Sequence, residues 1–153
     1  MNISFRQWLS LPFFFIVCFT VAYIGAIFPP GQWYEGLNRA PWSPPNIAFP
    51  IVWSTLYCFI AISGWWVFLH GLKKQKTLWC IQLILNVVWS WIFFGQHWVA
   101  VGLVDLLLLI ASVFLLILSC WRSNLKLPVL LLLPYLVWLL IATSLNTYIL
   151  LEN

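Results

Sequence analysis

The stretch that decides the fold is WVAVGLVDLLLLIASVFLLILSCW, residues 98–121, in which Asp105 is the only charged side chain. A bilayer core of about 30 Å is crossed by roughly 20 apolar residues in a helix that rises about 1.5 Å per residue. Hydrocarbon offers no hydrogen bonds to backbone groups, and the sequence lacks the short alternating segments of a β-barrel. The stretch is therefore predicted to cross a membrane as one α-helix.

Apolar runs of similar length lie on both sides of this stretch. They cover residues 8–28, 47–70, 77–95 and 127–151. The first run ends in Pro29-Pro30 without a small-residue cleavage site, so it is interpreted as a retained helix and not as a signal peptide. The sequence thus predicts an all-α fold, an integral membrane bundle of five transmembrane helices, in a single domain over residues 1–153.

The composition excludes a soluble protein. Apolar residues make up 64% of the chain and charged residues only 7%, whereas an ordinary soluble domain has about a quarter charged residues. The few basic residues give no support for nucleic-acid binding. The chain also contains 12 Trp, a residue that suits membrane interfaces and ligand pockets because its ring is apolar with one polar edge.

The basic residues gather at one face of the predicted bundle, and basic loops are retained on the cytoplasmic side of membranes. The first loop contributes only Arg39 to the opposite face. The N-terminus is therefore predicted to be cytoplasmic. The basic residues of the predicted cytoplasmic face are Arg6, Lys73, Lys74, Lys76, Arg122 and Lys126.

Three predicted helices each carry a polar or aromatic stripe at helical spacing. Residues three or four apart share one helix face, and polar side chains within a membrane are expected to face the bundle interior. These stripes are Trp53, Tyr57 and Gly64; Gln82, Asn86 and Ser90; and Tyr135, Trp138, Ala142 and Asn146. One interpretation is a pocket for a large flat ligand, and the other is hydrogen bonding between helices with no ligand.

The first connection, residues 29–46, contains five prolines and cannot form one continuous helix. A long loop rich in aromatic residues is typical of a lid over a binding site, and the alternative is a rigid cap that binds nothing. Asp105, the only acid within a predicted span, could be neutral, part of a proton path or structural. A structural bond is favoured, with Arg39 as its candidate partner. The four cysteines are interpreted as small buried apolar residues, and no metal site is predicted.

Five motifs resemble the TspO/MBR family of tryptophan-rich sensory proteins, translocator proteins and peripheral benzodiazepine receptors, over almost the whole chain. In this sequence they are WYxxLxxxxWxPP from Trp33, FPxVWxxLY from Phe49, QLxLNxxWSxxFFG from Gln82, LVDLLL from Leu103, and PYLxWxxxAxxLN from Pro134. The resemblance implies a five-helix bundle, often dimeric, that binds porphyrin, haem and other flat hydrophobic molecules beneath the first loop.

The resemblance also implies which residues hold the ligand, with Arg39 and Asp105 as structural polar residues. The implied ligand-binding residues are Tyr34, Pro44, Trp53, Tyr57, Asn86, Trp138 and Ala142. No cofactor is required, and porphyrin or haem is the expected ligand. The expected function is a membrane receptor or sensor that influences tetrapyrrole transport or light-dependent breakdown. The alternative is a transporter of such molecules, although the sequence lacks the inverted repeat common in transporters.

Three points qualify the resemblance. Some bacterial relatives degrade bound porphyrin in light, but that chemistry belongs to the excited ligand, so no enzyme and no catalytic residue is predicted. The cholesterol motif of the family ends in a basic residue, whereas Glu152 follows Tyr148 here, which makes cholesterol recognition doubtful and favours a bacterial member in the cell membrane. The third helix lacks a small-xxx-small pattern, so the interface of any homodimer is left open.

Overall fold

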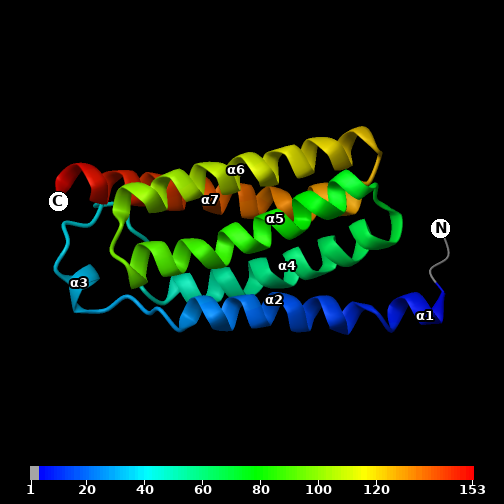
Figure 1. Ribbon diagram of the computed structural model, residues 1–153, viewed down its shortest axis with the longest axis horizontal. Coiled ribbons are helices and arrows are strands. Elements are labelled where there is room, and N and C mark those ends of the chain that lie inside the picture. The colour runs from blue at the N-terminus through cyan, green and yellow to red at the C-terminus, as the bar shows by residue number, and fades with distance from the viewer. Residues whose placement is uncertain (1–3) are drawn as a thin grey trace.

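The computed structural model describes residues 4–153, except for the side chain of Arg6, so the predicted place of that charge lies outside the described part. Five long helices lie side by side in one bundle (Figure 1). Within residues 4–153 there is no β-strand. The helices are α1 (Phe5–Trp8), α2 (Leu11–Ala26), α3 (Gln32–Glu35), α4 (Ala48–His70), α5 (Lys73–Ser90) with the π-helical turn η1 (Trp91–Gly95), α6 (Val99–Arg122) and α7 (Lys126–Glu152).

The predicted spans are confirmed as a five-helix membrane bundle. Four helices of the described chain, α4, α5 with η1, α6 and α7, are long and apolar enough to cross a membrane. The first span is shorter than predicted, because α2 has only 16 residues. Pro12 lies in the first turn of α2, where its missing N–H costs nothing, and it separates α2 from the short helix α1.

Helix α5 begins at Lys73, four residues before the predicted start at 77. The three lysines therefore lie in the first turns of the helix and not in a loop. The backbone N–H of Leu72 donates to Gln75 Oε1 at 2.8 Å, which satisfies one of the free donors at this helix start. Long lysine side chains can keep their charge in water at the end of a membrane helix, so counting apolar residues alone places the boundary too late.

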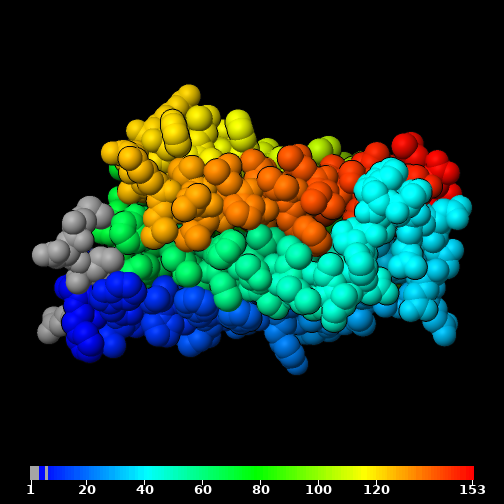
Figure 2. Space-filling model, turned by 180° about the vertical axis from the view of Figure 1, so that it is seen from behind, coloured from blue at the N-terminus to red at the C-terminus, as the bar shows by residue number. Residues whose placement is uncertain are grey.

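The two ends of the bundle differ in charge. The N-terminal end of the chain, the α4–α5 turn and the α6–α7 turn lie at one end of the bundle, and α3 and the C-terminus lie at the other (Figure 1). Lys73, Arg122 and Lys126 are at helix termini of the first end. The space-filling view shows the first loop gathered over the other end, beside the last turns of α7 (Figure 2).

The interior is a continuous apolar core formed by α2, α4, α5, α6 and α7. Cys18 and Cys120 are buried in it, as predicted, whereas Cys58 is half-buried and Cys80 is exposed on α5. The prediction of a buried thiol is wrong for Cys80, because an apolar residue of a membrane helix can face the lipid tails as readily as the protein interior.

Gly64 of α4 leaves room for a tryptophan side chain of α5. The indole of Trp79 lies directly against Gly64, and its Nε1 donates to the backbone oxygen of Ile60 at 3.0 Å. A Cβ at position 64 would overlap the rigid indole ring, so only glycine fits without displacing Trp79.

We expect Gly64→Ala to lower the free energy of unfolding by about 1–3 kcal/mol, because added atoms in a packed interior force the ring and the backbone apart. The measurement is unfolding of the purified protein in detergent, followed by heat or denaturant. Gly31→Ala is the matched control, since a Cβ there meets no atom within 4 Å. Equal stability of the two variants would contradict the packing argument.

Candidate ligand-binding site

A hydrogen-bonded bridge joins three helices in the middle of the bundle. Tyr57 Oη of α4 donates to Asn86 Oδ1 of α5 at 2.6 Å, and Asn86 Nδ2 donates to Tyr135 Oη of α7 at 2.8 Å. All three side chains are buried. The predicted inward stripes of these helices therefore meet, and one amide satisfies two tyrosine hydroxyls where neither water nor lipid headgroups can reach.

Aromatic rings extend this bridge toward the loop end of α4. The ring of Trp53 lies 5.6 Å from that of Tyr57 and 6.3 Å from that of Tyr135, measured between centroids. One turn earlier on α4, Phe49 contacts Trp138 edge to face at 5.7 Å. Trp138 is buried, and Trp53 and Ala142 are partly buried against the same core. The structure thus brings Trp53, Tyr57, Asn86 and Trp138 into one aromatic and amide cluster, with Ala142 one turn beyond Trp138.

Tyr34 lies elsewhere, on the short helix α3 of the loop. Its ring contacts Phe93 at 6.2 Å and Phe94 at 5.5 Å, both in the π-helical turn η1. In this turn the N–H of Gln96 bonds to the oxygen of Trp91 at 2.9 Å, five residues back. One extra residue per turn rotates the end of the helix, and π-turns of this kind are frequent at functional sites.

Trp33 makes two further contacts that hold the loop onto the bundle. Its ring lies edge to face with Phe93 of η1, with 5.7 Å between the ring centroids. Trp33 stacks on His97 with 4.1 Å between ring centroids. His97 has φ 60°, a left-handed conformation that a residue with a large side chain rarely adopts. The aromatic rings of the loop therefore pack on the end of α5 and on the turn that follows it.

Hydrogen bonds fasten the loop to the end of α7. The N–H of Asn38 donates to Asn153 Oδ1 at 2.9 Å, and Asn153 Nδ2 donates to the oxygen of Asn38 at 3.2 Å. Trp42 Nε1 donates to Ser144 Oγ at 3.2 Å, and its ring contacts Tyr148. Both halves of the loop are thus fixed to helices that lie more than 100 residues away in the sequence.

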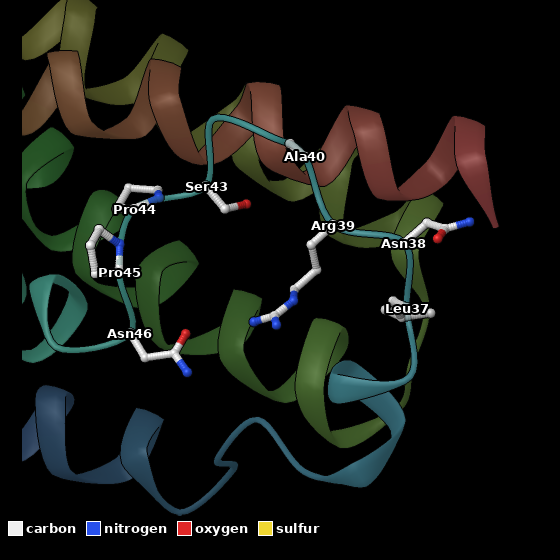
Figure 3. Close-up of a pocket in the computed structure, with 8 residues that line it drawn as sticks. All are labelled: Leu37, Asn38, Arg39, Ala40, Ser43, Pro44, Pro45 and Asn46. Atoms are coloured by element: carbon white, nitrogen blue, oxygen red, sulfur yellow. The ribbon is translucent and has the colours of Figure 1, made fainter.

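The loop borders an open cavity of about 620 Å³. Its lining residues are Leu37, Asn38, Arg39, Ala40, Ser43, Pro44, Pro45 and Asn46. In Figure 3 the side chains of Arg39 and Asn46 point into the space that the loop encloses. Of the predicted site residues, Pro44 and Arg39 line this cavity, and Pro45 and Asn46 lead directly into α4, which carries Phe49 and Trp53.

The predicted pairing of Arg39 with Asp105 is wrong. Asp105 is buried in α6, and its Oδ2 has no hydrogen-bond partner among residues 4–153. The Arg39 guanidinium lies instead over the ring of Tyr34, 5.7 Å from its centroid. Asp105 faces the other helices, whereas Arg39 is carried into the loop cavity, so a shared side of the membrane did not bring the two charges together.

Other buried polar atoms also lack a partner within the described chain. They are the side-chain amide of Gln82, Oδ1 of Asn146, Nε1 of Trp89 and Nε2 of His70. Asn146 Nδ2 does bond to the oxygen of Val99 at 3.0 Å, which ties α7 to the start of α6. A buried polar atom without a partner costs roughly 1–3 kcal/mol, so these atoms mark positions where water or a ligand group would be favourable.

Sequence reasoning missed several residues of this site. Tyr135, which the sequence places on the inward stripe of its helix but not among the ligand-binding residues, completes the bridge to Asn86. Phe49 packs on Trp138, four residues before Trp53 on the same helix face. No local pattern pointed to Asn38, Asn153 or the π-turn, because these depend on contacts between distant segments.

A bundle of membrane-spanning helices with an aromatic and amide interior under a structured loop defines the chain as a multi-pass integral membrane protein. The family model described as "TspO/MBR family" matches residues 14–151. The chain therefore belongs to the TspO/MBR family.

Relatives of similar length extend this result. The chain is 39% identical over 140 residues to "Protein CrtK" of Rhodobacter capsulatus, with 87% of this chain and 86% of the relative covered. It is 36% identical to "Tryptophan-rich protein TspO" of Chlorobaculum tepidum, with 97% and 98% covered. It is 30% identical to "Tryptophan-rich sensory protein" of Cereibacter sphaeroides, with 95% and 90% covered. These similarities span nearly the full length of each chain.

We expect Asn86→Ala to destabilise the protein by about 1–3 kcal/mol, because it leaves two buried tyrosine hydroxyls without their partner. Tyr135→Phe should cost less, since Asn86 Oδ1 still accepts from Tyr57. The measurement is denaturant unfolding in detergent, with Cys80→Ala, an exposed change on the same helix, as control. An Asn86→Ala protein as stable as Tyr135→Phe would show that the bridge is not cooperative.

Proposed function

We propose that this protein is a membrane receptor or sensor that binds porphyrin, haem and similar flat hydrophobic molecules between its loop and its helices. The role of a membrane receptor or sensor is supported by similarity over 95% of this chain to a protein named as a sensory protein. The proposal that the ligand is a porphyrin or a similar flat molecule rests on one observation. Three helices bring an aromatic and amide cluster together next to the loop, and its residues are Trp53, Tyr57, Asn86 and Trp138.

The residues present fit such a ligand. The loop cavity of about 620 Å³, which Pro44 lines and the aromatic cluster does not, lies in the range of about 300–1,000 Å³ typical of small-molecule pockets. Aromatic side chains attract a flat π-system by offset stacking or edge contacts. Trp53 and Trp138 would hold the ring system, and Asn86 and Tyr57 would orient it by hydrogen bonding. Tyr34, which packs on η1, would contact the ligand from the side of the loop. Pro44 and Ala142 would shape the walls.

Light-dependent breakdown of a bound porphyrin is part of this proposal but gives no residue a catalytic role. A photoexcited tetrapyrrole supplies the oxidising chemistry itself. The aromatic residues of this chain would hold the ligand and restrict the access of water. Tyr34, Trp53 and Trp138 are the side chains whose oxidation under illumination would be followed.

We expect Trp53→Phe with Trp138→Phe to weaken protoporphyrin IX binding by about tenfold, because each aromatic contact contributes roughly 0.5–1.5 kcal/mol and about 1.4 kcal/mol is tenfold in affinity. The titration follows the absorbance of the porphyrin itself, so that loss of Trp does not change the readout. Saturable binding by the wild type is required.

The matched control is Trp8→Phe with Trp121→Phe, which also removes two indoles but at exposed positions away from the loop. Its affinity should equal that of the wild type. Equal, non-saturating partition of porphyrin into both variants, the wild type and empty micelles would contradict the proposal. Uptake into proteoliposomes by the wild type would favour the transporter alternative over the receptor.

We further propose that the N-terminus is cytoplasmic, in a bacterial cell membrane, and that the loop faces outward. The support is that Lys73, Lys74, Lys76, Arg122 and Lys126 lie at the bundle end opposite to the loop. Positively charged segments next to membrane helices are retained in the cytoplasm. A ligand would then reach the loop cavity from the outer side.

We expect a membrane-impermeant maleimide to label Gln32→Cys on intact cells, and to label Leu72→Cys only after the membrane is opened. Gln32 lies in α3 of the loop, and Leu72 lies in the α4–α5 turn with an exposed side chain. The wild-type protein gives the background from its own four cysteines. The reverse labelling pattern would overturn the orientation.

A further inference from the structure

The end of the bundle opposite to the loop concentrates positive charge (Figure 1). Its basic residues are Lys73, Lys74, Lys76, Arg122 and Lys126. The three acidic residues of the chain lie elsewhere, since Glu35 ends α3, Glu152 ends α7, and Asp105 is buried near the start of α6. Within residues 4–153, no carboxylate therefore offsets the charge at this end.

A buried glutamine holds the two turns of this end together. Gln75, in the first turn of α5, is buried, and its Nε2 donates to the oxygen of Ser119 and to Ser123 Oγ, both at 2.9 Å. Its Oε1 accepts from the N–H of Leu72 at 2.8 Å. The start of α5 is thus fixed to the end of α6, so the basic residues of the α4–α5 and α6–α7 turns lie in one place.

Four of the five basic side chains are exposed. Lys76 differs, because it is half-buried and its ammonium group lies over the ring of Phe68, 5.8 Å from the centroid. The four exposed residues form what we call the basic patch, which consists of Lys73, Lys74, Arg122 and Lys126. Two turns therefore present four cations to the surroundings of the protein.

The stability of the helices does not explain these lysines. Both α5 and α7 begin at this end, and neither has an acidic residue in its first turn. A helix start is the positive end of the helix dipole, where a negative side chain is favourable and a lysine is not. Retention of basic segments explains the side of the membrane, but it does not require lysines in the first turns of two helices. A bound anion would offset both the side-chain charges and the two dipoles.

Exposed tryptophans place the basic patch at the level of the lipid headgroups. Trp121 precedes Arg122 and is exposed, and Trp8, at the same end of the bundle, is exposed as well. Tryptophan gathers at the boundary between hydrocarbon and water. Lysine and arginine beside such a belt extend to the phosphates of the lipids. This depth favours a lipid over a soluble acidic protein as the source of the anion.

We propose that the basic patch binds the phosphate of an anionic phospholipid in the leaflet that faces this end of the bundle. Ammonium and guanidinium groups donate charge-assisted hydrogen bonds to phosphate oxygens. A phosphatidylcholine headgroup carries its own cation beside the phosphate, so it is attracted less. The inference goes beyond the proposed receptor function and does not depend on porphyrin binding. Free phosphate offers the same oxygens, so the experiment separates it from the lipid.

The test counts phospholipids bound to the full chain in detergent micelles by native mass spectrometry. The protein is titrated with phosphatidylglycerol or with phosphatidylcholine of identical acyl chains. We expect the wild type to bind the first phosphatidylglycerol about tenfold more tightly, because each basic side chain near a lipid phosphate adds attraction. Lys73→Gln with Lys74→Gln, and separately Arg122→Gln with Lys126→Gln, should each lower this preference at least threefold.

Two controls separate the basic patch from net charge and from folding. Arg39→Gln with Lys76→Gln also removes two positive charges, but outside the basic patch, and should keep the preference within twofold. Lys73→Arg with Lys74→Arg keeps the charge and should keep the preference. Thermal unfolding of each variant in phosphatidylcholine verifies that it is folded, and the affinity for phosphatidylcholine should be unchanged.

Several results would overturn the lipid site. Equal binding of the two lipids by the wild type would do so, as would an equal loss in the control that removes Arg39 and Lys76. If only one of the two glutamine pairs lowers the preference, the turns do not form one site. If inorganic phosphate displaces the lipid more than chloride of equal ionic strength does, the basic patch binds free phosphate. If polyglutamate displaces the lipid, its partner is an acidic protein.

Discussion

The structure depends on the lack of hydrogen-bonding solvent in hydrocarbon. A polar group inside the membrane is stabilised by a partner within the protein, so the backbone is helical and several polar side chains face one another, although buried atoms of Gln82 and Asp105 have no partner within residues 4–153. Gln75 shows the rule: its amide accepts from the N–H of Leu72 and donates to the oxygen of Ser119 and to Ser123 Oγ. Asn86 repeats the pattern by joining α4, α5 and α7 through two tyrosines. The same bonds that fix helix positions also place aromatic rings around a common centre.

The features that follow from local sequence were predictable. Span length depends on counting apolar residues, and the boundaries of α4, α6 and α7 agree with the predicted spans within about a residue, which is closer than such boundaries are usually placed. Inward faces depend on helical periodicity, and Tyr57, Asn86 and Trp138 are buried as their spacing indicated. The TspO/MBR resemblance rested on motifs that carry these same faces, which is why the motifs and the periodicity selected the same residues.

The features that depend on distant contacts were not predictable. Asn38 and Asn153 are 115 residues apart, and neither belongs to a periodic pattern. In the π-turn at the end of α5, a backbone hydrogen bond spans five residues and not four. The sequence there is apolar, and no residue type in it predicts this change. Arg39 and Asp105 were paired because both lie toward the same membrane face, but the fastened loop directs Arg39 over Tyr34. The predicted topology therefore indicates on which side of the membrane a charged residue lies, but it does not indicate which residue it contacts.

The structure of the loop depends both on its local sequence and on its contacts with distant segments. Its prolines restrict the backbone, and its contacts with η1 and α7 fix it at both sides of the cavity, so little additional order is needed to keep that cavity open. Stiffness of this kind suits a site that lies at the membrane boundary, where the ring cluster of Trp53 and Trp138 is apolar and the Arg39 cavity can be hydrated.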